Sequence, residues 1–470
     1  MRQIKEFTKN IAYSIISNAM NLIVTAATSL IIPLLLGANV KQYGYYQMYL
    51  FYTAYIGFFH FGLCDGVLLK EGGKKYSDLN KKEYSFQFLW LIGLEIVITC
   101  ILLLTMFFIG AKEDYLFIAF AFGINLIIFL PRNLLAYILQ ATNRIKESSF
   151  ITIIGRSIYL CGLLVLFLLK NSDYKYFVVA DLIGKLIALI YVILRCKDIV
   201  FCKPICIKLG MHVVTENISI GIKLMLASIS SMIISGIAQF AIQTKWSVET
   251  YGKISLTLSM TNLVLTFISA IAIVLYPTLR RVSNNTAREL YGHIETILMI
   301  LLMSSLVFCY PIQLVLNNLL PQYSDGIKYL PILFPVCIFS AKVALLVQTY
   351  MQVYRMEKKI LQINLVGIGI TLLYICISTL ILKNLTMTVM AIPISHAIRC
   401  FYAEYILEKQ IEIQKSAYSI FELIMIAIFI GFSYWSGMFL GMCIYAAIYV
   451  AYLALQKNNV KNAISCIKSF

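Results

Sequence analysis

Long apolar segments are the feature that most constrains how this chain can fold. About 20 apolar residues are enough for one helix to span a bilayer. Lipid offers no hydrogen bonds to an exposed backbone, and these segments lack the alternation of barrel strands, so we expect helices. Fourteen transmembrane helices are predicted, at residues 11–36, 46–69, 85–110, 115–139, 149–169, 177–195, 220–242, 251–279, 293–316, 331–353, 363–383, 387–407, 418–435 and 437–455.

Composition agrees with an all-α polytopic membrane protein. Hydrophobic residues make up 60% of the 470 residues and charged residues only 13%, whereas soluble domains average about 45–50% and about 25%. A soluble core does not need that much apolar surface, so the excess is expected to face lipid.

The net charge of +17 is explained by topology and does not require a nucleic-acid partner. With the N-terminus inside, the loops facing the cytoplasm hold 26 of the 39 Lys and Arg residues, the outer loops hold 7 and the spans hold 6. This asymmetry follows the positive-inside rule. We therefore expect a bacterial cytoplasmic (inner) membrane protein with both termini in the cytoplasm and an even number of helices.

Short matches recur at a nearly constant offset and predict an internal repeat. Three pairs carry it: Asn10-Ile11 and Asn217-Ile218; Lys41-Gln-Tyr-Gly44 and Glu249-Thr-Tyr-Gly252; Phe129-Leu-Pro-Arg132 and Phe339-Ser-Ala-Lys342. Each unit would hold six helices, so the repeat would be parallel. The predicted organisation is an N-terminal lobe at 1–200, a cytoplasmic linker at 201–219, a C-terminal lobe at 220–410, and two further helices with a tail at 411–470.

Basic side chains within the predicted spans are candidates for an anion-binding cavity between the two lobes. A charge at the bilayer centre costs about 2.5–3.5 kcal/mol on insertion scales, so such residues usually face a polar cavity or a partner. The candidates are Arg132, Arg156, Lys185, Lys342, His396 and Arg399. Arginine suits a diphosphate because its planar fork binds two oxygens at once. The structural alternative stays open: Asp181 and Lys185 are spaced to pair with each other, and residues near helix ends can extend to the interface.

Acidic side chains in the spans are candidates for ion coupling or for a gate. We place Asp65, Glu95 and Asp181 in this group. No metal site and no bound cofactor are expected, and the coupling ion would be H⁺ or Na⁺. The chain has no Walker A motif, so ATP hydrolysis is not expected.

Four segments resemble oligosaccharide flippases of the Wzx type, in the multidrug/oligosaccharidyl-lipid/polysaccharide (MOP) superfamily. They are Tyr43-Gly-Tyr-Tyr46, Phe61-Gly-Leu-Cys-Asp-Gly66, Glu71-Gly-Gly-Lys-Lys75 and the run from Leu139 to Glu147. The resemblance implies two six-helix lobes with rocker-switch alternating access. It also implies an undecaprenyl-diphosphate-linked oligosaccharide as cargo, ion gradients or membrane potential as the driving force, and polysaccharide polymerase machinery as a partner. Wzx proteins often have twelve helices, so the fourteen predicted here depart from that pattern.

Three other functions remain as alternatives to a non-enzymatic flippase. A MATE-type multidrug or cation antiporter would need acids in its cavity, whereas the deep charges here are mostly basic. A membrane-embedded polymerase or glycosyltransferase usually carries a sizeable catalytic loop, and the outer loops here are short. A non-transporting scaffold would not need buried cations in both lobes.

Overall fold

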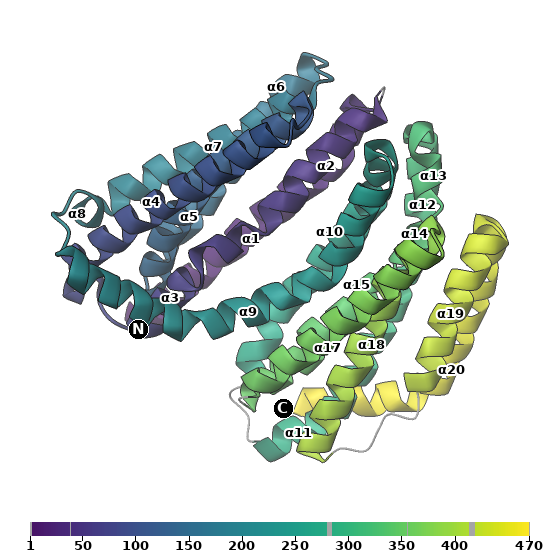
Figure 1. Ribbon diagram of the computed structural model, residues 1–470. Helices are drawn as coiled ribbons and strands as arrows, with labels where there is room; N and C mark the ends of the chain where they lie inside the picture. Colours follow the sequence, from purple (N-terminus) through teal and green to yellow (C-terminus); the bar gives the residue numbers. More distant parts are fainter. Residues whose placement is uncertain (1, 38, 280–283, 355, 413–418, 470) are drawn as a thin grey trace. The chain divides into compact units, whose positions relative to one another are not determined.

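The computed structural model describes the chain except residues 1, 38, 280–283, 355, 413–418 and 470. Its described part is built from helices, with no strand. It divides into two compact units, Met1–Ile229 and Ser230–Phe470, and the boundary lies inside α9 (Ile207–Lys245). Each unit is described separately below, with its helices labelled as in Figure 1.

Within the described residues, every range predicted as a transmembrane helix is helical apart from local breaks, and residue 418 of the range 418–435 lies outside them. In the described chain, ten helices are long and apolar enough to cross a membrane, or eleven if one bent pair counts as a single span. Helices α10, α18 and α19 are not among them. Helix α19 is apolar but has only 17 residues. A multi-pass, all-helical membrane protein is confirmed, while the count of fourteen spans stays a prediction.

In unit 1, α5 is the central helix. It packs against α2, α3, α4, α6 and α7, and α1 packs on α6. Figure 1 shows α4, α5, α6 and α7 running alongside one another. The bounds are α1 (Arg2–Leu35), α2 (Val40–Ala54), α3 (Leu63–Glu71), α4 (Lys81–Phe108), α5 (Glu113–Ala141), α6 (Ile145–Leu168), α7 (Tyr174–Arg195) and α8 (Lys197–Val200).

The predicted helix at residues 46–69 is broken rather than continuous. Helix α2 is followed by a 3₁₀ turn, Ile56–His60, and the chain then bends by 57° into α3. Phe61 and Gly62 lie at the break with φ values of 49° and 89°, the left-handed region that ends a right-handed helix. Apolarity continues through the break, which is why hydrophobicity alone predicted a single helix there.

Glycines let α3 approach α9 closely. A Cβ atom on Gly66 would lie 1.8 Å from the carbonyl oxygen of Asn217, and one on Gly221 would lie 2.0 Å from that of Gly62. No real side chain tolerates such distances, so the two backbones can meet here only because these side chains are missing. The contact fixes the short helix α3 against the beginning of α9.

In unit 2, α18 packs against α14, α15 and α17, while α20 packs against α11 and α19. One membrane-length segment, Leu330–Val353, is far more enclosed than the others and contains the π-helical turn Lys342–Val347. The bounds are α10 (Val248–Leu279), α11 (Asn284–Ser305), α12 (Cys309–Leu319), α13 (Ser324–Ile327), α14 (Leu330–Leu333), α15 (Val336–Ala341), α16 (Gln348–Val353), α17 (Glu357–Cys376), α18 (Leu385–Ile411), α19 (Ser419–Trp435) and α20 (Met438–Ser469).

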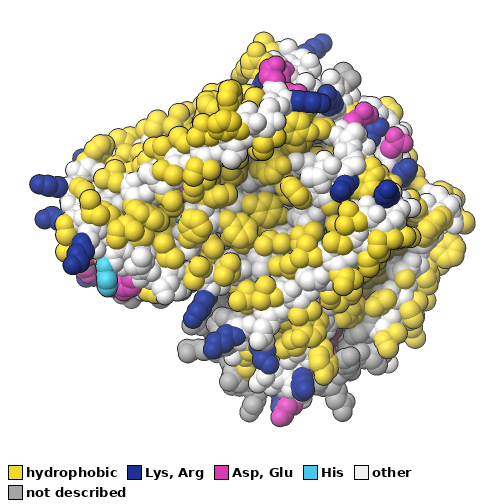
Figure 2. All heavy atoms as spheres, viewed as in Figure 1, with side chains coloured by type: hydrophobic (Ala, Val, Ile, Leu, Met, Phe, Trp, Pro, Cys, Tyr) yellow, Lys and Arg dark blue, Asp and Glu magenta, His cyan; other side chains and the backbone are white. Residues whose placement is uncertain are grey.

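Large apolar side chains are exposed along the helices, as a lipid-facing surface requires. Phe107, Phe108 and Leu168 are among the most exposed. Figure 2 shows hydrophobic atoms covering much of the visible face, with Lys and Arg in small separate groups. Water would penalise such a surface, whereas lipid tails do not.

Candidate functional site

A cavity of about 210 Å³ within unit 1 brings together four of the predicted site residues. Arg132 comes from α5, Arg156 from α6, and Asp181 and Lys185 from α7. The cavity is also lined by Asn21, Phe129, Thr152, Gly155 and Tyr159. Because α5, α6 and α7 pack against one another, residues far apart in sequence converge on this space.

Lys185 is neutralised inside this cavity. Its ammonium lies 2.6 Å from the Asp181 carboxylate, one turn away on α7. Asp181 also accepts a hydrogen bond of 2.7 Å from Tyr49. The structure therefore shows the i, i+4 pairing that was the structural alternative for Lys185.

Arg132 and Arg156 keep their charge uncompensated. Neither makes an ion pair with any residue that the structure describes. Arg156 donates from Nε to the side-chain oxygen of Asn21 at 3.0 Å, and the Arg132 guanidinium lies 4.5 Å from the centre of the Phe129 ring. Three basic groups and one carboxylate thus line the cavity, which leaves an excess of two positive charges. Such a space attracts an anion.

Lys342, the residue that the repeat pairs with Arg132, has a different environment. It is only 2% exposed and contacts two carboxylates, Glu295 at 3.0 Å and Glu404 at 2.6 Å. Its role as an anion ligand stays a prediction. The two carboxylates of unit 2 already balance its positive charge. Glu295 was not among the predicted site residues, although it falls within the predicted helix 293–316.

His396 and Arg399 lie one turn apart on α18 but have different neighbours. The two ring nitrogens of His396 share hydrogen bonds with hydroxyl groups, Nε2 with Ser235 at 2.7 Å and Nδ1 with Ser340 at 3.1 Å. Arg399 lines a narrow pocket of about 10 Å³, which has room for about one water molecule.

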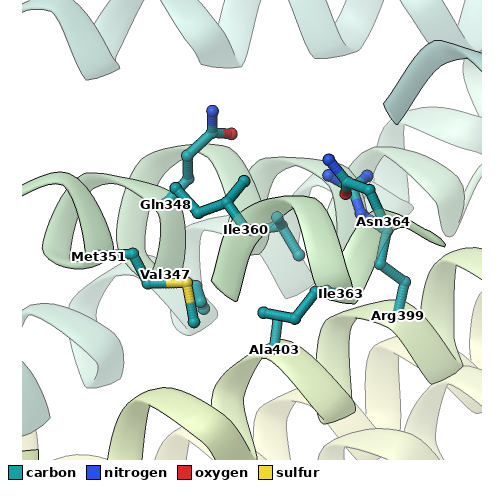
Figure 3. Close-up of a pocket in the computed structure, with 9 residues that line it drawn as sticks. Val347, Gln348, Met351, Ile360, Ile363, Asn364, Arg399 and Ala403 are labelled. Carbon is teal, nitrogen blue, oxygen red and sulfur yellow. The ribbon is translucent and has the colours of Figure 1, made fainter. Parts of the chain in front are cut away.

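Arg399 is a buried cation in unit 2. Figure 3 shows its side chain extending towards Asn364, with Gln348 at the other side of the pocket. Arg399 is 7% exposed and makes no ion pair with any described residue, and its Nε has no hydrogen-bond partner among them. Unlike Lys342, it keeps a free positive charge.

Asp65 and Glu95, the other two acids proposed for coupling, do not line the unit 1 cavity. Asp65 is 3.8 Å from Nε2 of His60, whose Nδ1 accepts the backbone N–H of Gly62 at 3.0 Å. This places Asp65 beside the break between α2 and α3. Glu95 on α4 is fully buried, and neither carboxyl oxygen has a hydrogen-bond partner among the described residues. Their coupling role stays a prediction.

No family model matches the chain, and no curated protein matches its sequence. Solved structures do match its fold. An inward-facing multidrug resistance MATE family transporter of the MOP superfamily gives a TM-score of 0.65 at 13% identity, covering 83% of this chain and 98% of that one. The lipid II flippase MurJ, in an inward closed conformation, gives 0.61 at 13% identity, covering 96% and 99%.

A third structure, MATE in complex with MaL6, gives a TM-score of 0.58 at 12% identity and covers 87% of this chain and 96% of that one. Identity this low shows the fold alone. The chain therefore has a MATE-like fold of the kind found in MOP-superfamily transporters, which the resemblance predicted. The Wzx branch stays a prediction.

Proposed function

We propose that the chain flips an undecaprenyl-diphosphate-linked oligosaccharide from the cytoplasmic to the outer leaflet of a bacterial inner membrane, by alternating access and without ATP. The observation that carries this proposal is the pair of unpaired guanidinium groups, Arg132 and Arg156, in the unit 1 cavity. A diphosphate offers each of them oxygen acceptors for charge-assisted, bidentate hydrogen bonds.

The fold supports transport of a lipid-linked cargo. The matched structures are transporters by their descriptions, and the one that covers 96% of this chain is a lipid II flippase. A cationic drug would be repelled by the excess of positive charge in the cavity. This is why we favour an anionic cargo, although the highest TM-score quoted above belongs to a multidrug transporter.

The test is flipping of a fluorescent undecaprenyl-diphosphate oligosaccharide in vesicles that contain the purified chain. We expect Arg132→Ala and Arg156→Ala each to remove most of the activity. Arg195→Ala is the matched control, since Arg195 is an exposed arginine at the end of α7 that lies over Tyr191. Wild-type flipping by both cavity variants would overturn the anion site. Export of a cationic drug with no flipping of the lipid would favour the multidrug alternative.

A further inference from the structure

Three buried charged side chains meet in the interior of unit 2. The Lys342 ammonium lies 3.0 Å from Oε1 of Glu295 and 2.6 Å from Oε1 of Glu404. Exposed fractions are 2%, 6% and 3% for Lys342, Glu295 and Glu404. The three residues come from three separate segments, the π-helical turn, α11 and α18. Since water does not reach them, their charges must balance within the protein.

The charges balance only if one carboxyl group carries a proton. Two ionised carboxylates against one ammonium would leave a net charge of −1 in a buried site. The two carboxyl groups are close neighbours, because an Oε1 atom of each lies within 3.0 Å of the same ammonium nitrogen. An ionised carboxylate is an acceptor only, so a hydrogen bond between two carboxyl groups needs a hydrogen on one of them. No described group hydrogen-bonds to Oε1 of Glu295 or of Glu404, although the Lys342 ammonium lies close to both.

Among the described titratable groups around the cluster, none forms a further ion pair with Glu295 or Glu404. Glu422 on α19 accepts a hydrogen bond of 2.8 Å from Tyr452 on α20. The other groups that interact electrostatically with the cluster are Tyr291 on α11, Cys400 on α18 and Tyr452 on α20, which carry no charge while protonated. Arg399 acts on the neighbouring Cys400 but forms no ion pair with a described acid. Two ionised carboxylates this close would repel each other.

We propose that Glu295, Lys342 and Glu404 form a proton-binding site, in which one proton is shared by the two carboxyl groups. Na⁺ does not fit this site, because the Lys342 ammonium already takes the place of a cation between the oxygens. Binding converts a carboxylate to a carboxylic acid, and release returns that proton to water and leaves two carboxylates that repel each other. Release would therefore loosen α11 from α18. The π-helical turn that begins at Lys342 agrees with this role, because such turns recur at functional sites.

The inference names H⁺ as the coupling ion of the proposed flippase. Only this coupling role rests on the proposed function. The proton site itself is tested without any cargo. Infrared spectra of the full chain in lipid nanodiscs, recorded across a pH titration, show each protonated carboxyl group by its carbonyl band. Wild type should show a band that disappears on raising the pH.

Glutamine variants make the test specific. Glu295→Gln and Glu404→Gln should each lose one protonated carboxyl per chain, since the remaining carboxylate is balanced by Lys342. Lys342→Gln should instead gain one, because both acids then lack a cation. Glu412→Gln is the control, as the Glu412 side chain is 81% exposed, and it should match wild type. Unchanged bands in both glutamate variants would overturn the site.

The same variants separate this site from the proposed function. Vesicles carrying a pH gradient measure how far flipping of the fluorescent lipid depends on protons. If wild type flips no lipid while the infrared bands behave as expected, the proposed cargo is wrong and the proton site stands. If wild type flips lipid and Glu295→Gln keeps the full dependence on the pH gradient, the coupling role is wrong.

Discussion

Asp181 lies 2.6 Å from Lys185, and this pair decides which cations of the unit 1 cavity are free to meet a ligand. With Lys185 balanced, Arg132 and Arg156 supply the excess charge. The same distinction holds in unit 2, where Lys342 is balanced by two carboxylates and Arg399 is not. The proposed anion site therefore rests on arginines rather than on lysines.

A first prediction concerns the chemistry of Arg132. Arg132→Lys keeps the charge but loses the planar fork, so we expect weaker binding of a diphosphate. A hydrogen bond to a charged group contributes about 1.5–3 kcal/mol, which corresponds to a loss of about tenfold or more in affinity. Calorimetric titration of the purified chain with inorganic pyrophosphate measures this. Equal affinity in Arg132→Lys and wild type would show that the fork is not used.

A second prediction concerns the Asp181–Lys185 pair. Asp181→Asn leaves the Lys185 ammonium with a neutral neighbour in a largely buried place, and breaking a buried pair in this way costs about 3–5 kcal/mol. We expect a lower midpoint of thermal unfolding in detergent. The double variant Asp181→Asn with Lys185→Gln should recover much of the loss, because no unpaired charge remains. A double variant as unstable as the single one would contradict this account.

A third prediction concerns the contact between α3 and α9. Gly66→Ala places a methyl group where only 1.8 Å separates it from a backbone oxygen, and a backbone cannot yield as a side chain can. Overpacking of this kind costs about 1–3 kcal/mol, and more where backbone must move. Gly93→Ala is the matched control, since no atom lies within 4 Å of its added Cβ. Thermal unfolding should separate the two variants, and similar midpoints would argue against the close approach.

A fourth prediction concerns topology. Both Lys75 and Lys383 are exposed in loops, and the charge pattern places the first inside and the second outside. Lys383→Cys should react with a membrane-impermeant maleimide in intact cells, whereas Lys75→Cys should react only after permeabilisation. Labelling of Lys75→Cys in intact cells would contradict a cytoplasmic N-terminus, and a Lys383→Cys that reacts only after permeabilisation would contradict the outer loop.

Hydrophobicity and charge predicted much of the fold, because lipid imposes the same demand on every span. The helices followed from hydrophobicity and the Asp181–Lys185 pairing from the i, i+4 spacing along one helix, whereas the MATE-like fold was implied by the resemblance of four segments. The break at Phe61–Gly62 did not, since apolarity continues through it and only a backbone in the left-handed region reveals it. The partners of a buried charge could also not be predicted from the sequence where these partners lie on other helices.

Glu295 shows this limit most clearly. It lies 47 residues before Lys342 in sequence, near the beginning of a predicted span, where an acid usually meets water. Only the packing of α11 beside the π-helical turn brings it to the ammonium. In the same way, Asn21 and Tyr49 join the unit 1 cavity network through the packing of α1 and α2, and no spacing rule connects them to Arg156 or Asp181.

The meeting of Gly62, Gly66 and Gly221 has a practical use in finding relatives of this chain. The matched structures share only about one residue in eight with this chain. Aligned apolar residues are weak evidence of homology when most of a sequence is apolar. A missing side chain at each of three fixed positions is a steric requirement that substitution between apolar residues cannot imitate. Distant sequences that keep all three glycines in register can thus be sorted from unrelated membrane proteins of similar composition.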